Sequence, residues 1–340
     1  MAHRLSVGGR EIRRGTVEQI LLKVGEYYTA GPVHVPVTVI CGEERGPILY
    51  LTAATHGDEL NGVETVRRVM TSITPGQLAG TLICVPVVNR MGFQNHSRYL
   101  PGRRDLNRHF PGDPGGHAAS RTAHVLFREI VAPSRYGIDL HTASVGRTNL
   151  PHVRGDMSND RVRRIARAFG SEIIIDSPGA PRTLRAAATR AGVPTIILEA
   201  GETFRFQRNM VAHGVTGVRN VMASLGMLAE RPKEARFQVV IKVSEWVRST
   251  RGGIADIQVR PGEIVYRGDE IASITNPFGR EVSSVRTPLT GLIIGITTVP
   301  MVNPGDAICH VAKLRKTLSR VESYCVTDSS GRRTLPVPTA

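Results

Sequence analysis

Residues 51–64 read Leu51-Thr-Ala-Ala-Thr-His56-Gly-Asp-Glu59-Leu-Asn-Gly-Val-Glu64. They join an apolar run, Pro47 to Ala54, to a segment from Asn61 to Thr71 that has the composition of a helix. A buried strand that ends in His-x-x-Glu directs an imidazole and a carboxylate at one spot, and Gly57 allows a tight turn between them. The stretch therefore predicts a strand, a turn that carries chemistry, and a helix.

Imidazole nitrogen and carboxylate oxygen are ordinary zinc ligands, and a catalytic zinc takes three protein ligands and leaves one position open. His56 and Glu59 are thus two thirds of a candidate zinc site. The alternative is a plain strand-to-helix turn in which Asp58 or Glu59 faces the helix N-terminus, where negative charge is favourable. The rest of the chain decides between the two.

The chain has 340 residues, which predicts one main domain and a smaller one. Its formal net charge of +15 comes from arginine, since lysine occurs only at positions 23, 233, 242, 313 and 316. The arginines are scattered, without a basic block or interleaved aromatic residues, so we expect no nucleic-acid partner. A few arginines could still line a pocket for an anionic substrate.

The sequence also indicates a compartment. No apolar stretch approaches the roughly 20 residues of a membrane span, and the polar N-terminus lacks a signal-peptide apolar region. The four cysteines are far apart and form no CxxC pair, which argues against a disulfide framework or a cysteine zinc site. We expect a soluble, cytoplasmic protein with no membrane partner.

Apolar and helical segments alternate through the first two thirds of the chain. The expected strands are 48–54, 81–88, 137–142, 172–176 and 194–200, and the expected helices are 61–71, 160–169, 183–191 and 206–228. This alternation predicts an α/β domain over residues 1–235, with a largely parallel, buried sheet flanked by helices and a β segment at 1–46. Sites in such sheets lie at the carboxyl ends of strands. Those ends hold His56, Asn89, His141 and Glu199.

Helical periodicity disappears after about residue 235. Residues 236–315 contain a weak internal repeat, in which 253–271 resembles 291–308, each with a glycine turn, a strand, a Gly-Asp turn and another strand. Two similar β-halves resemble the barrel-sandwich hybrid of biotinyl and lipoyl carriers. The hairpin at 275–281 lacks the lysine that a carrier needs, so we expect a β-sandwich lid or oligomerisation module. Residues 316–340 are expected to be a poorly ordered tail.

A third zinc ligand should come from a later strand end. His141 is the best candidate, because it follows a short apolar strand and Asp139 lies on the same strand face, where it can fix the imidazole. Glu199 directly follows four apolar residues, and a carboxylate there is costly to bury without a role. It is the candidate general base, with Glu202 as the alternative.

A loop-rich segment supplies candidate substrate-binding groups. Arg98, Asn107 and Arg108 lie in it, and arginine grips a carboxylate with two parallel hydrogen bonds. The alternative is ordinary surface turn chemistry.

Four separated motifs together resemble the succinylglutamate desuccinylase/aspartoacylase family, of the zinc-carboxypeptidase-like superfamily. They are His56-x-x-Glu59, Asp105-Leu-Asn107-Arg108-x-Phe110-Pro-Gly, Asp139-Leu-His141-Thr and Glu199-x-Gly201. The resemblance covers roughly residues 40–230, in the right order, and the C-terminal β-module also resembles that of these deacylases.

The resemblance implies a role for each matching residue. His56, Glu59 and His141 would bind one zinc ion per chain, and Glu199 would be the general base. Asn107 and Arg108 would hold the substrate carboxylate. Arg98 would polarise the scissile carbonyl, although Arg103 or Arg104 could substitute for it, and Arg185 or Arg190 would supply a further substrate arginine.

The resulting prediction is a zinc-dependent amidohydrolase that cleaves an N-acyl amino acid or a similar small amide, and that forms a homo-oligomer. One rival is a metallocarboxypeptidase, which needs a groove open to peptides. The other is a binding protein that keeps the fold without catalysis.

Overall fold

In the computed structural model, residues 5–329 and 331–336 are described. The helices are α1 (Asn61–Thr71), α2 (Arg90–Gln94), α3 (Ala118–Leu126), α4 (Asp160–Phe169), α5 (Leu184–Arg190), α6 (Arg208–Ser224) and α7 (Leu318–Glu322). The strands up to α6 are β1 (Ser6–Val7), β2 (Arg10–Glu11), β3 (Thr16–Glu26), β4 (Pro32–Cys41), β5 (Glu44–Ala53), β6 (Ala79–Val85), β7 (Tyr136–His141), β8 (Arg147–Gly155), β9 (Ile173–Asp176) and β10 (Thr195–Gly201). The later strands are β11 (Val239–Ile241), β12 (Ser244–Arg248), β13 (Gly253–Ile257), β14 (Ile264–Val265), β15 (Glu270–Thr275), β16 (Glu281–Arg286), β17 (Gly291–Thr297), β18 (Met301–Val302), β19 (Ala307–Lys313), β20 (Val326–Thr327) and β21 (Arg333–Thr334).

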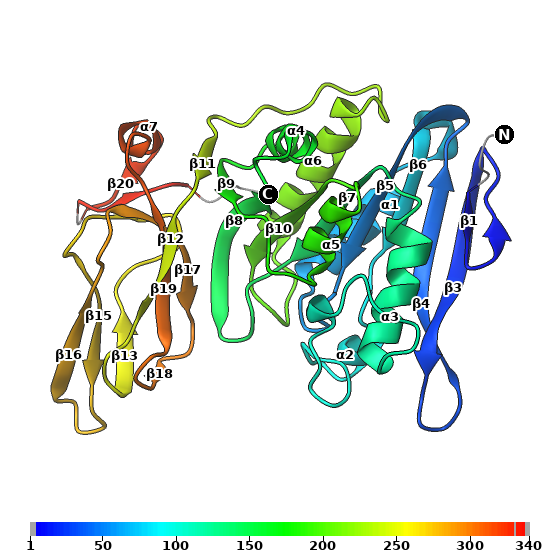
Figure 1. Ribbon diagram of the computed structural model, residues 1–340. Helices are drawn as coiled ribbons and strands as arrows, with labels where there is room; N and C mark the ends of the chain where they lie inside the picture. The colour runs from blue at the N-terminus through cyan, green and yellow to red at the C-terminus, as the bar shows by residue number, and fades with distance from the viewer. Residues whose placement is uncertain (1–4, 330, 337–340) are drawn as a thin grey trace.

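Thirteen strands of the described chain form one mixed sheet (Figure 1). At its centre β6, β5, β7 and β10 lie side by side and are parallel. Antiparallel strands extend it on both sides, with β4 and β3 beyond β6 and with β8 beyond β10. The predicted α/β class is confirmed, with the parallel strands confined to the centre of the sheet.

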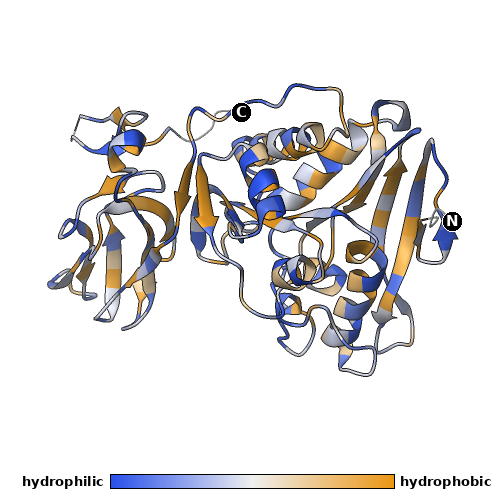
Figure 2. Cartoon of the chain, turned by 45° about the horizontal axis from the view of Figure 1, so that its top comes forward, coloured by the Kyte–Doolittle hydropathy of each residue, from blue (hydrophilic) through white to orange (hydrophobic). Residues whose placement is uncertain are grey.

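Helices cover both faces of this sheet because successive side chains on each strand point to opposite faces. Leu49 and Leu51 of β5 pack in one core with residues of α1, α4 and α6, whereas Tyr50 packs in the other core with residues of α3 and α5. Figure 2 shows hydrophobic residues along the strands and hydrophilic residues on outward-facing turns of the helices.

The C-terminal strands are divided between two sheets. Strands β17, β19 and β12 continue the main sheet, because β17 pairs with β8. Strands β16, β15, β13 and β18 form a separate four-stranded sheet. Residues of both sheets share one core, which includes Ala255, Ile274, Ile293 and Val311. The C-terminal part is therefore a small sandwich that lies beyond β8 (Figure 1).

The two halves of the internal repeat use the same turn. The Asp269 carboxylate accepts a hydrogen bond from Tyr266 N at 2.8 Å, and the Asp306 carboxylate accepts one from Asn303 N at 2.7 Å. The glycine before each aspartate, Gly268 or Gly305, has a positive φ, which glycine adopts without strain. The equivalent turns support two related β-halves.

The segment after residue 315 differs from the expected disordered tail. It contains α7 and the pair β20–β21, and Val321 and Leu335 are buried against the core that includes Leu292 and Leu314. The segment is mostly polar, but its few apolar residues pack into a core that other strands form, and this packing orders it. Residues 337–340 of the expected tail lie outside the described residues.

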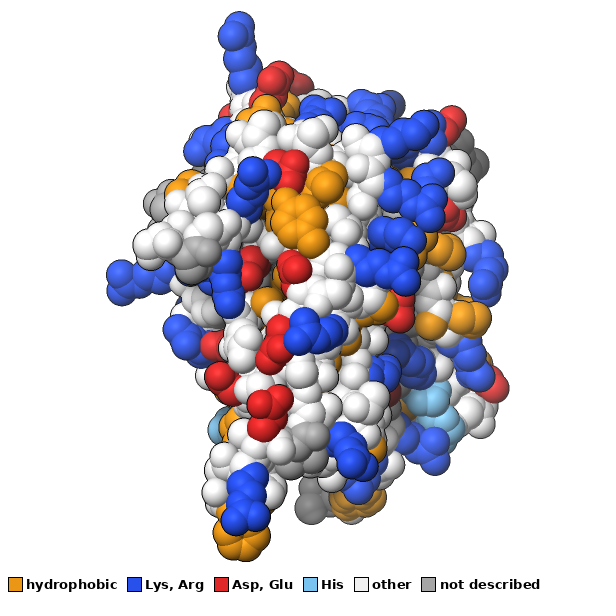
Figure 3. Space-filling model, turned by 90° about the vertical axis from the view of Figure 1, so that its left-hand side faces the viewer, with side chains coloured by type: hydrophobic (Ala, Val, Ile, Leu, Met, Phe, Trp, Pro, Cys, Tyr) orange, Lys and Arg blue, Asp and Glu red, His pale blue; other side chains and the backbone are white. Residues whose placement is uncertain are grey.

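The surface bears basic side chains in many places. Figure 3 shows Lys and Arg distributed over the C-terminal end of the molecule, with acidic side chains among them. Within the described part of the chain, no helix has the length and apolar character needed to cross a membrane.

Candidate active site

Three neighbouring parallel strands bring the candidate residues to one edge of the sheet. The loop after β5 carries His56 and Glu59, β7 ends at His141, and β10 contains Glu199. Strands β7 and β10 pair in a register that sets Glu199 beside His141. The carboxyl ends of parallel strands meet at one edge, so residues far apart in sequence converge here.

The turn that carries His56 is fixed by close packing. A Cβ atom added at Gly57 would lie 2.1 Å from the backbone carbon of Gly92, in helix α2. The φ of Gly57 is not in the left-handed region. Glycine is therefore required for the approach of two backbones, and not for the tight turn that the sequence suggested.

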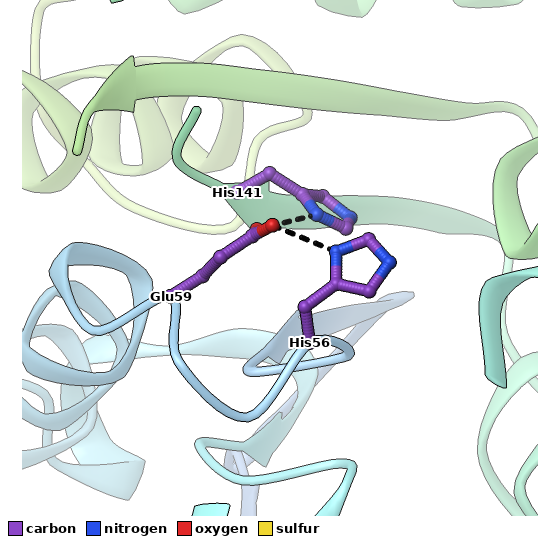
Figure 4. A group of neighbouring side chains, drawn as sticks. All are labelled: His56, Glu59 and His141. Atoms are coloured by element: carbon purple, nitrogen blue, oxygen red, sulfur yellow. Dashed lines mark hydrogen bonds and ion pairs between the residues drawn. The ribbon is translucent and has the colours of Figure 1, made fainter. Parts of the chain in front are cut away.

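Glu59 joins the two histidines (Figure 4). Its Oε1 lies 2.8 Å from Nδ1 of His56, and its Oε2 lies 2.8 Å from Nδ1 of His141. All three side chains are buried, and their candidate ligand atoms lie within 4.8 Å of one another. The predicted ligand trio is thus brought together in space.

Each imidazole is held on its other side by a second carboxylate. Asp139 Oδ2 lies 2.7 Å from Nε2 of His141, and Asp105 Oδ1 lies 3.1 Å from Nε2 of His56. Each carboxylate accepts the N–H of Nε2, so Nδ1 of the same ring remains available as a metal ligand. This is the usual arrangement around a metal.

Electrostatics keep the buried carboxylate ionised. Burial alone would raise the pKa of Glu59, but the facing imidazoles of His56 and His141 outweigh burial and hold its pKa well below the usual range. For His141, burial opposes protonation, but Asp139 and then Glu59 raise its pKa well above the usual value. The buried carboxylate of Glu59 and the two imidazoles thus stabilise one another's charged forms.

This donor set fits zinc. Two imidazole Nδ1 atoms and one carboxylate converge, and the Nε2 atoms of the two imidazoles are occupied by carboxylates. Two histidines and one glutamate are a known catalytic zinc ligand set. Within the described residues, these are the His, Cys, Asp and Glu side chains that converge closely enough to hold a metal ion.

Of the three candidate arginines in the nearby loop, Arg98 lies at the cluster. Its guanidinium donates to Glu59 Oε1 at 3.3 Å and to Asp105 Oδ2 at 3.2 Å. Arg103 and Arg104 are exposed and do not line the cavity. Asn89 has a supporting position, because its side chain caps α2 and donates to the carbonyl of Arg98.

Glu199 is half-buried and faces the same cavity as the cluster. Asn149 Nδ2 donates to its Oε2 at 3.2 Å, and Arg154 Nε lies 3.9 Å from its Oε1. The alternative, Glu202, pairs with Arg205 and lies outside the cavity lining.

Asn107 and Arg108 also line the cavity, in the short 3-10 turn Leu106–Arg108. Asn107 Oδ1 accepts a hydrogen bond from Leu184 N at 2.8 Å and so fixes the start of α5. Its Nδ2 donates to no described residue, and Arg108 is exposed, so both can donate to a ligand.

Helix α5 places one of its two candidate arginines in the site. Arg185 is buried and lines the cavity, whereas Arg190 is exposed in the last turn. Burial of the guanidinium, with the charge of Arg154 second, lowers the pKa of Arg185 to about 10.

The cavity has a volume of about 470 Å³. Besides the residues named above, Trp246 of β12 forms part of its wall. The Arg147 guanidinium lies 4.7 Å from the Trp246 ring centroid, and the ring stacks on His310 at 4.5 Å. The C-terminal strands thus contribute directly to the site.

Several lining residues had no signal in the sequence analysis. Strand β8, which carries Arg147, Asn149 and Arg154, was not expected at all. Its apolar side chains Leu150 and Val153 are three positions apart and Pro151 lies between them, so the segment lacks the period-2 alternation that predicts a strand. Asp105 belongs to a quoted motif, but its contact with His56 spans 49 positions and has no sequence signature.

The chain matches a known protein family over more than half of its length. The model of the succinylglutamate desuccinylase/aspartoacylase catalytic domain matches residues 45–225. An N-alpha-acetyl-L-2,4-diaminobutyric acid deacetylase from Halomonas elongata is 27% identical over 302 residues, which cover 85% of this chain and 88% of the relative.

Solved structures agree with this match. A succinylglutamate desuccinylase/aspartoacylase from Rhodobacter sphaeroides has a TM-score of 0.81 at 25% identity, covering 89% of this chain and 97% of the other. The ectoine utilization protein EutE from Ruegeria pomeroyi, in a product-bound structure, has a TM-score of 0.82 at 24% identity, with the same coverage. The second likeness concerns the fold alone.

Proposed function

The chain belongs to the succinylglutamate desuccinylase/aspartoacylase family and is a hydrolase of linear amide bonds; we propose that it is a zinc-dependent deacylase of N-acyl amino acids or similar small amides that bear a carboxylate. The observation that carries the proposal is one cavity in which Glu59 joins two imidazoles and Glu199 lies beside His141.

His56, Glu59 and His141 would hold the zinc ion, one per chain. A zinc ion held there supplies a Lewis acid that polarises the amide carbonyl and makes water easier to deprotonate. Asp139 and Asp105 keep the two imidazoles in the tautomer that binds a metal, because each accepts the outer ring N–H.

Glu199 would serve as the general base and then as the general acid. Its carboxylate takes a proton from the attacking water and returns it to the leaving amine, which a half-buried, cavity-facing carboxylate can do. Asn149 supports this role because its amide fixes one oxygen of Glu199 and leaves the other available.

Three groups in the loop would orient the substrate. Arg98 reaches the metal-ligand cluster and is placed to stabilise negative charge on the carbonyl oxygen. Asn107 Nδ2 and the Arg108 guanidinium would hold the substrate carboxylate, since both residues line the cavity.

We also propose that residues 1–235 form the catalytic unit and that residues 236–315 narrow its cleft. Trp246 in the cavity wall supports the second part of this proposal. A narrowed cleft favours a small amide over a peptide. A homo-oligomer formed through the outer sheet of this module is our proposal for assembly, because Ile254 and Met301 are exposed there.

The cytoplasm is our proposal for location. The four cysteines are all free, as is common in a reducing compartment.

The proposal is tested by metal analysis together with hydrolysis of two substrate sets. N-acetyl and N-succinyl amino acids form one set, including N-acetyl-2,4-diaminobutyrate, and N-blocked dipeptides form the other. The account expects about one zinc per chain and turnover of the first set. Turnover of dipeptides alone would favour a carboxypeptidase, and absence of zinc binding would favour a non-catalytic protein.

A further inference from the structure

Strand β10 is irregular directly after Glu199, the proposed general base. Its pairing with β7 ends at Glu199, and its pairing with β8 shifts in register between Glu199 and Gly201. Ala200 therefore has no partner residue in either neighbouring strand of the described sheet. The residue of β8 that would continue the ladder is Pro151, which has no N–H to donate. Irregularities of this kind lie next to many active sites, where they re-aim a side chain.

The carbonyl of Ala200 is bound by a side chain from another loop. Asn61 Nδ2 donates to this oxygen at 3.1 Å and to Oε1 of Gln207 at 3.0 Å. Asn61 Oδ1 accepts a hydrogen bond from the backbone N–H of Gln207 at 2.8 Å. Asn61 is buried and is the first residue of α1, two positions after Glu59. One buried amide thus joins the loop of the proposed metal ligands to the strand that carries Glu199.

Gln207 completes this connection on the other side of Gly201. Its Oε1 also accepts a hydrogen bond from the backbone N–H of Glu202 at 2.9 Å. Because that N–H can only donate, Gln207 must present its oxygen, and Asn61 must in turn present its nitrogen. The two side chains, which we call the Asn61–Gln207 clamp, therefore hold the residues before and after Gly201 with one consistent set of hydrogen bonds.

The clamp accounts for the glycine of the Glu199-x-Gly201 motif. Gly201 has a φ of 74°, in the left-handed region that glycine adopts without strain. A Cβ atom added there would lie 2.0 Å from Oε1 of Gln207 and 2.7 Å from Nδ2 of Asn61. Glycine is therefore required both for the backbone conformation and for the space that the clamp occupies.

The end of β7 is tied to the same network. Thr142 N donates to Oε2 of Glu59 at 3.1 Å, and Ala143 N donates to the carbonyl of Gly201 at 3.0 Å. The hydrogen bonds thus form a closed circuit, from the loop after β5 to the end of β7, then to the end of β10, and back through Asn61. A displacement of any one strand end breaks hydrogen bonds to the other two.

We propose that Asn61 and Gln207 are positioning residues that hold β10 in the irregular course that aims Glu199 at the proposed metal ligands. Neither residue is among the described residues that line the cavity, so both act through Glu199 and not on the substrate. The inference rests on the proposed role of Glu199 as general base. A misplacement of about 1 Å can lower the rate of a reaction about 100-fold, so the placement of this carboxylate matters.

Kinetics of zinc-loaded Asn61→Ala test the inference on the best N-acyl amino acid substrate. We expect kcat to fall roughly 10- to 100-fold, as for a misplaced catalytic group, while KM stays within about threefold and the zinc content is unchanged. A wild-type kcat in this variant would overturn the inference.

Asn220 supplies a matched control. It is also a buried asparagine that holds a loop, because its Nδ2 donates to the carbonyl of Lys233 at 2.9 Å and its Oδ1 accepts from Lys233 N at 2.7 Å. Asn220→Ala should lower the melting temperature as Asn61→Ala does, but it should leave kcat near the wild-type value. Equal losses of kcat in the two variants would mean that destabilisation alone explains the effect, and would overturn the inference.

The second half of the clamp has its own pair of variants. Gln207→Glu keeps an oxygen for Asn61 Nδ2 and for Glu202 N, whereas Gln207→Met removes it. We expect the methionine variant to repeat the loss of kcat and the glutamate variant to retain most of the wild-type kcat. Equal kcat values in the two variants would contradict the role of Gln207 Oε1. This pair tests the clamp even if Asn61→Ala does not fold.

The double variant Asn61→Ala/Glu199→Gln separates positioning from general support of the fold. If the clamp acts through Glu199, the alanine should lower the residual kcat of Glu199→Gln by less than about threefold, because the group that it positions is already absent. A further loss as large as that in the wild-type background would mean that Asn61 acts on other groups, and the inference would fail.

Crystal structures separate this inference from the proposed function. The feature to compare is the hydrogen bond from Asn149 Nδ2 to Glu199 Oε2, which is 3.2 Å long in wild type. We expect it to be lost in zinc-supplemented Asn61→Ala and kept in Asn220→Ala. If wild type hydrolyses no amide, the proposed deacylase function fails, but the positioning of Glu199 by the clamp still stands when this hydrogen bond is lost. A Glu199 carboxylate in the same place in wild type and Asn61→Ala would overturn the inference.

Discussion

Asp139 Oδ2 lies 2.7 Å from Nε2 of His141, two residues further along β7, while Glu59 lies 2.8 Å from Nδ1 on the opposite edge of the same ring. Asp139 Oδ1 accepts hydrogen bonds from Thr52 at 2.7 Å and from Thr55 at 3.2 Å. The aspartate is thus oriented by two hydroxyls, and it orients the imidazole in turn.

This arrangement predicts the effect of Asp139→Asn. The two threonine hydroxyls would still donate to Oδ1 of the new amide, so its Nδ2–H would face Nε2 of His141. Nε2 would then have to accept a hydrogen bond, and the ring proton would move to Nδ1, the proposed ligand atom. Zinc affinity should fall roughly 10- to 100-fold, the usual effect of such partners. Competition with a chromogenic chelator measures it. Asp160→Asn, at an exposed site, is the control, and an unchanged zinc affinity in Asp139→Asn would refute the argument.

Removal of the metal should weaken the fold. A ligand that binds only the folded state, at a concentration of 100 times its dissociation constant, adds about 2.7 kcal/mol to the free energy of unfolding. Chelator-treated protein should therefore melt a few degrees lower, and added zinc should restore the melting temperature. Glu59→Gln should abolish the zinc-dependent shift, because the buried negative charge is lost. A full shift in that variant would exclude Glu59 as a ligand.

Gly57→Ala should destabilise the protein. The added Cβ would meet the Gly92 backbone at 2.1 Å, and overpacking of this kind costs about 1–3 kcal/mol in the free energy of unfolding. Gly25→Ala is the matched control, since nothing lies within 4 Å of an added Cβ there. Urea unfolding measures both variants. Equal urea midpoints for the two variants would show that the backbone around Gly57 shifts at little cost, and would contradict this prediction.

Asn107 should contribute both to the stability of the fold and to substrate binding. Asn107→Ala leaves Leu184 N without its acceptor and should cost about 1–3 kcal/mol in the free energy of unfolding, while also raising KM. Asn107→Asp keeps the acceptor but replaces the donor that would face the substrate carboxylate. The aspartate variant should therefore keep most of the stability and still raise KM. A normal KM in Asn107→Asp would remove Asn107 from the substrate site.

The local parts of this fold could be predicted from the sequence. Helix α4 and the strand ends at His141 and Glu199 follow from hydrophobic periodicity and from the position of polar residues after apolar runs. The convergence of His56, Glu59 and His141, the candidate zinc ligands, could be predicted because two strand ends were expected at one edge of a sheet.

Contacts between distant segments could not be predicted in the same way. The Asp105–His56 contact, the pairing of β17 with β8 and the entry of Trp246 into the cavity depend on tertiary packing. Tertiary packing also decides which candidate arginines line the cavity. Arg98 does so and Arg103 and Arg104 do not. Arg185 does so and Arg190 does not. The ordered segment with α7 was missed because its few apolar residues find a core made by other strands.

The most direct test of the central claim is hydrolysis of the best N-acyl amino acid substrate by zinc-loaded Glu199→Gln, with Glu202→Gln as the matched control. The account predicts that Glu199→Gln keeps about one zinc per chain but loses roughly 10²- to 10⁴-fold in kcat, the contribution of a general base. Glu202→Gln should stay near wild type, because Glu202 lies outside the cavity lining. Wild-type turnover by zinc-loaded Glu199→Gln would contradict the account.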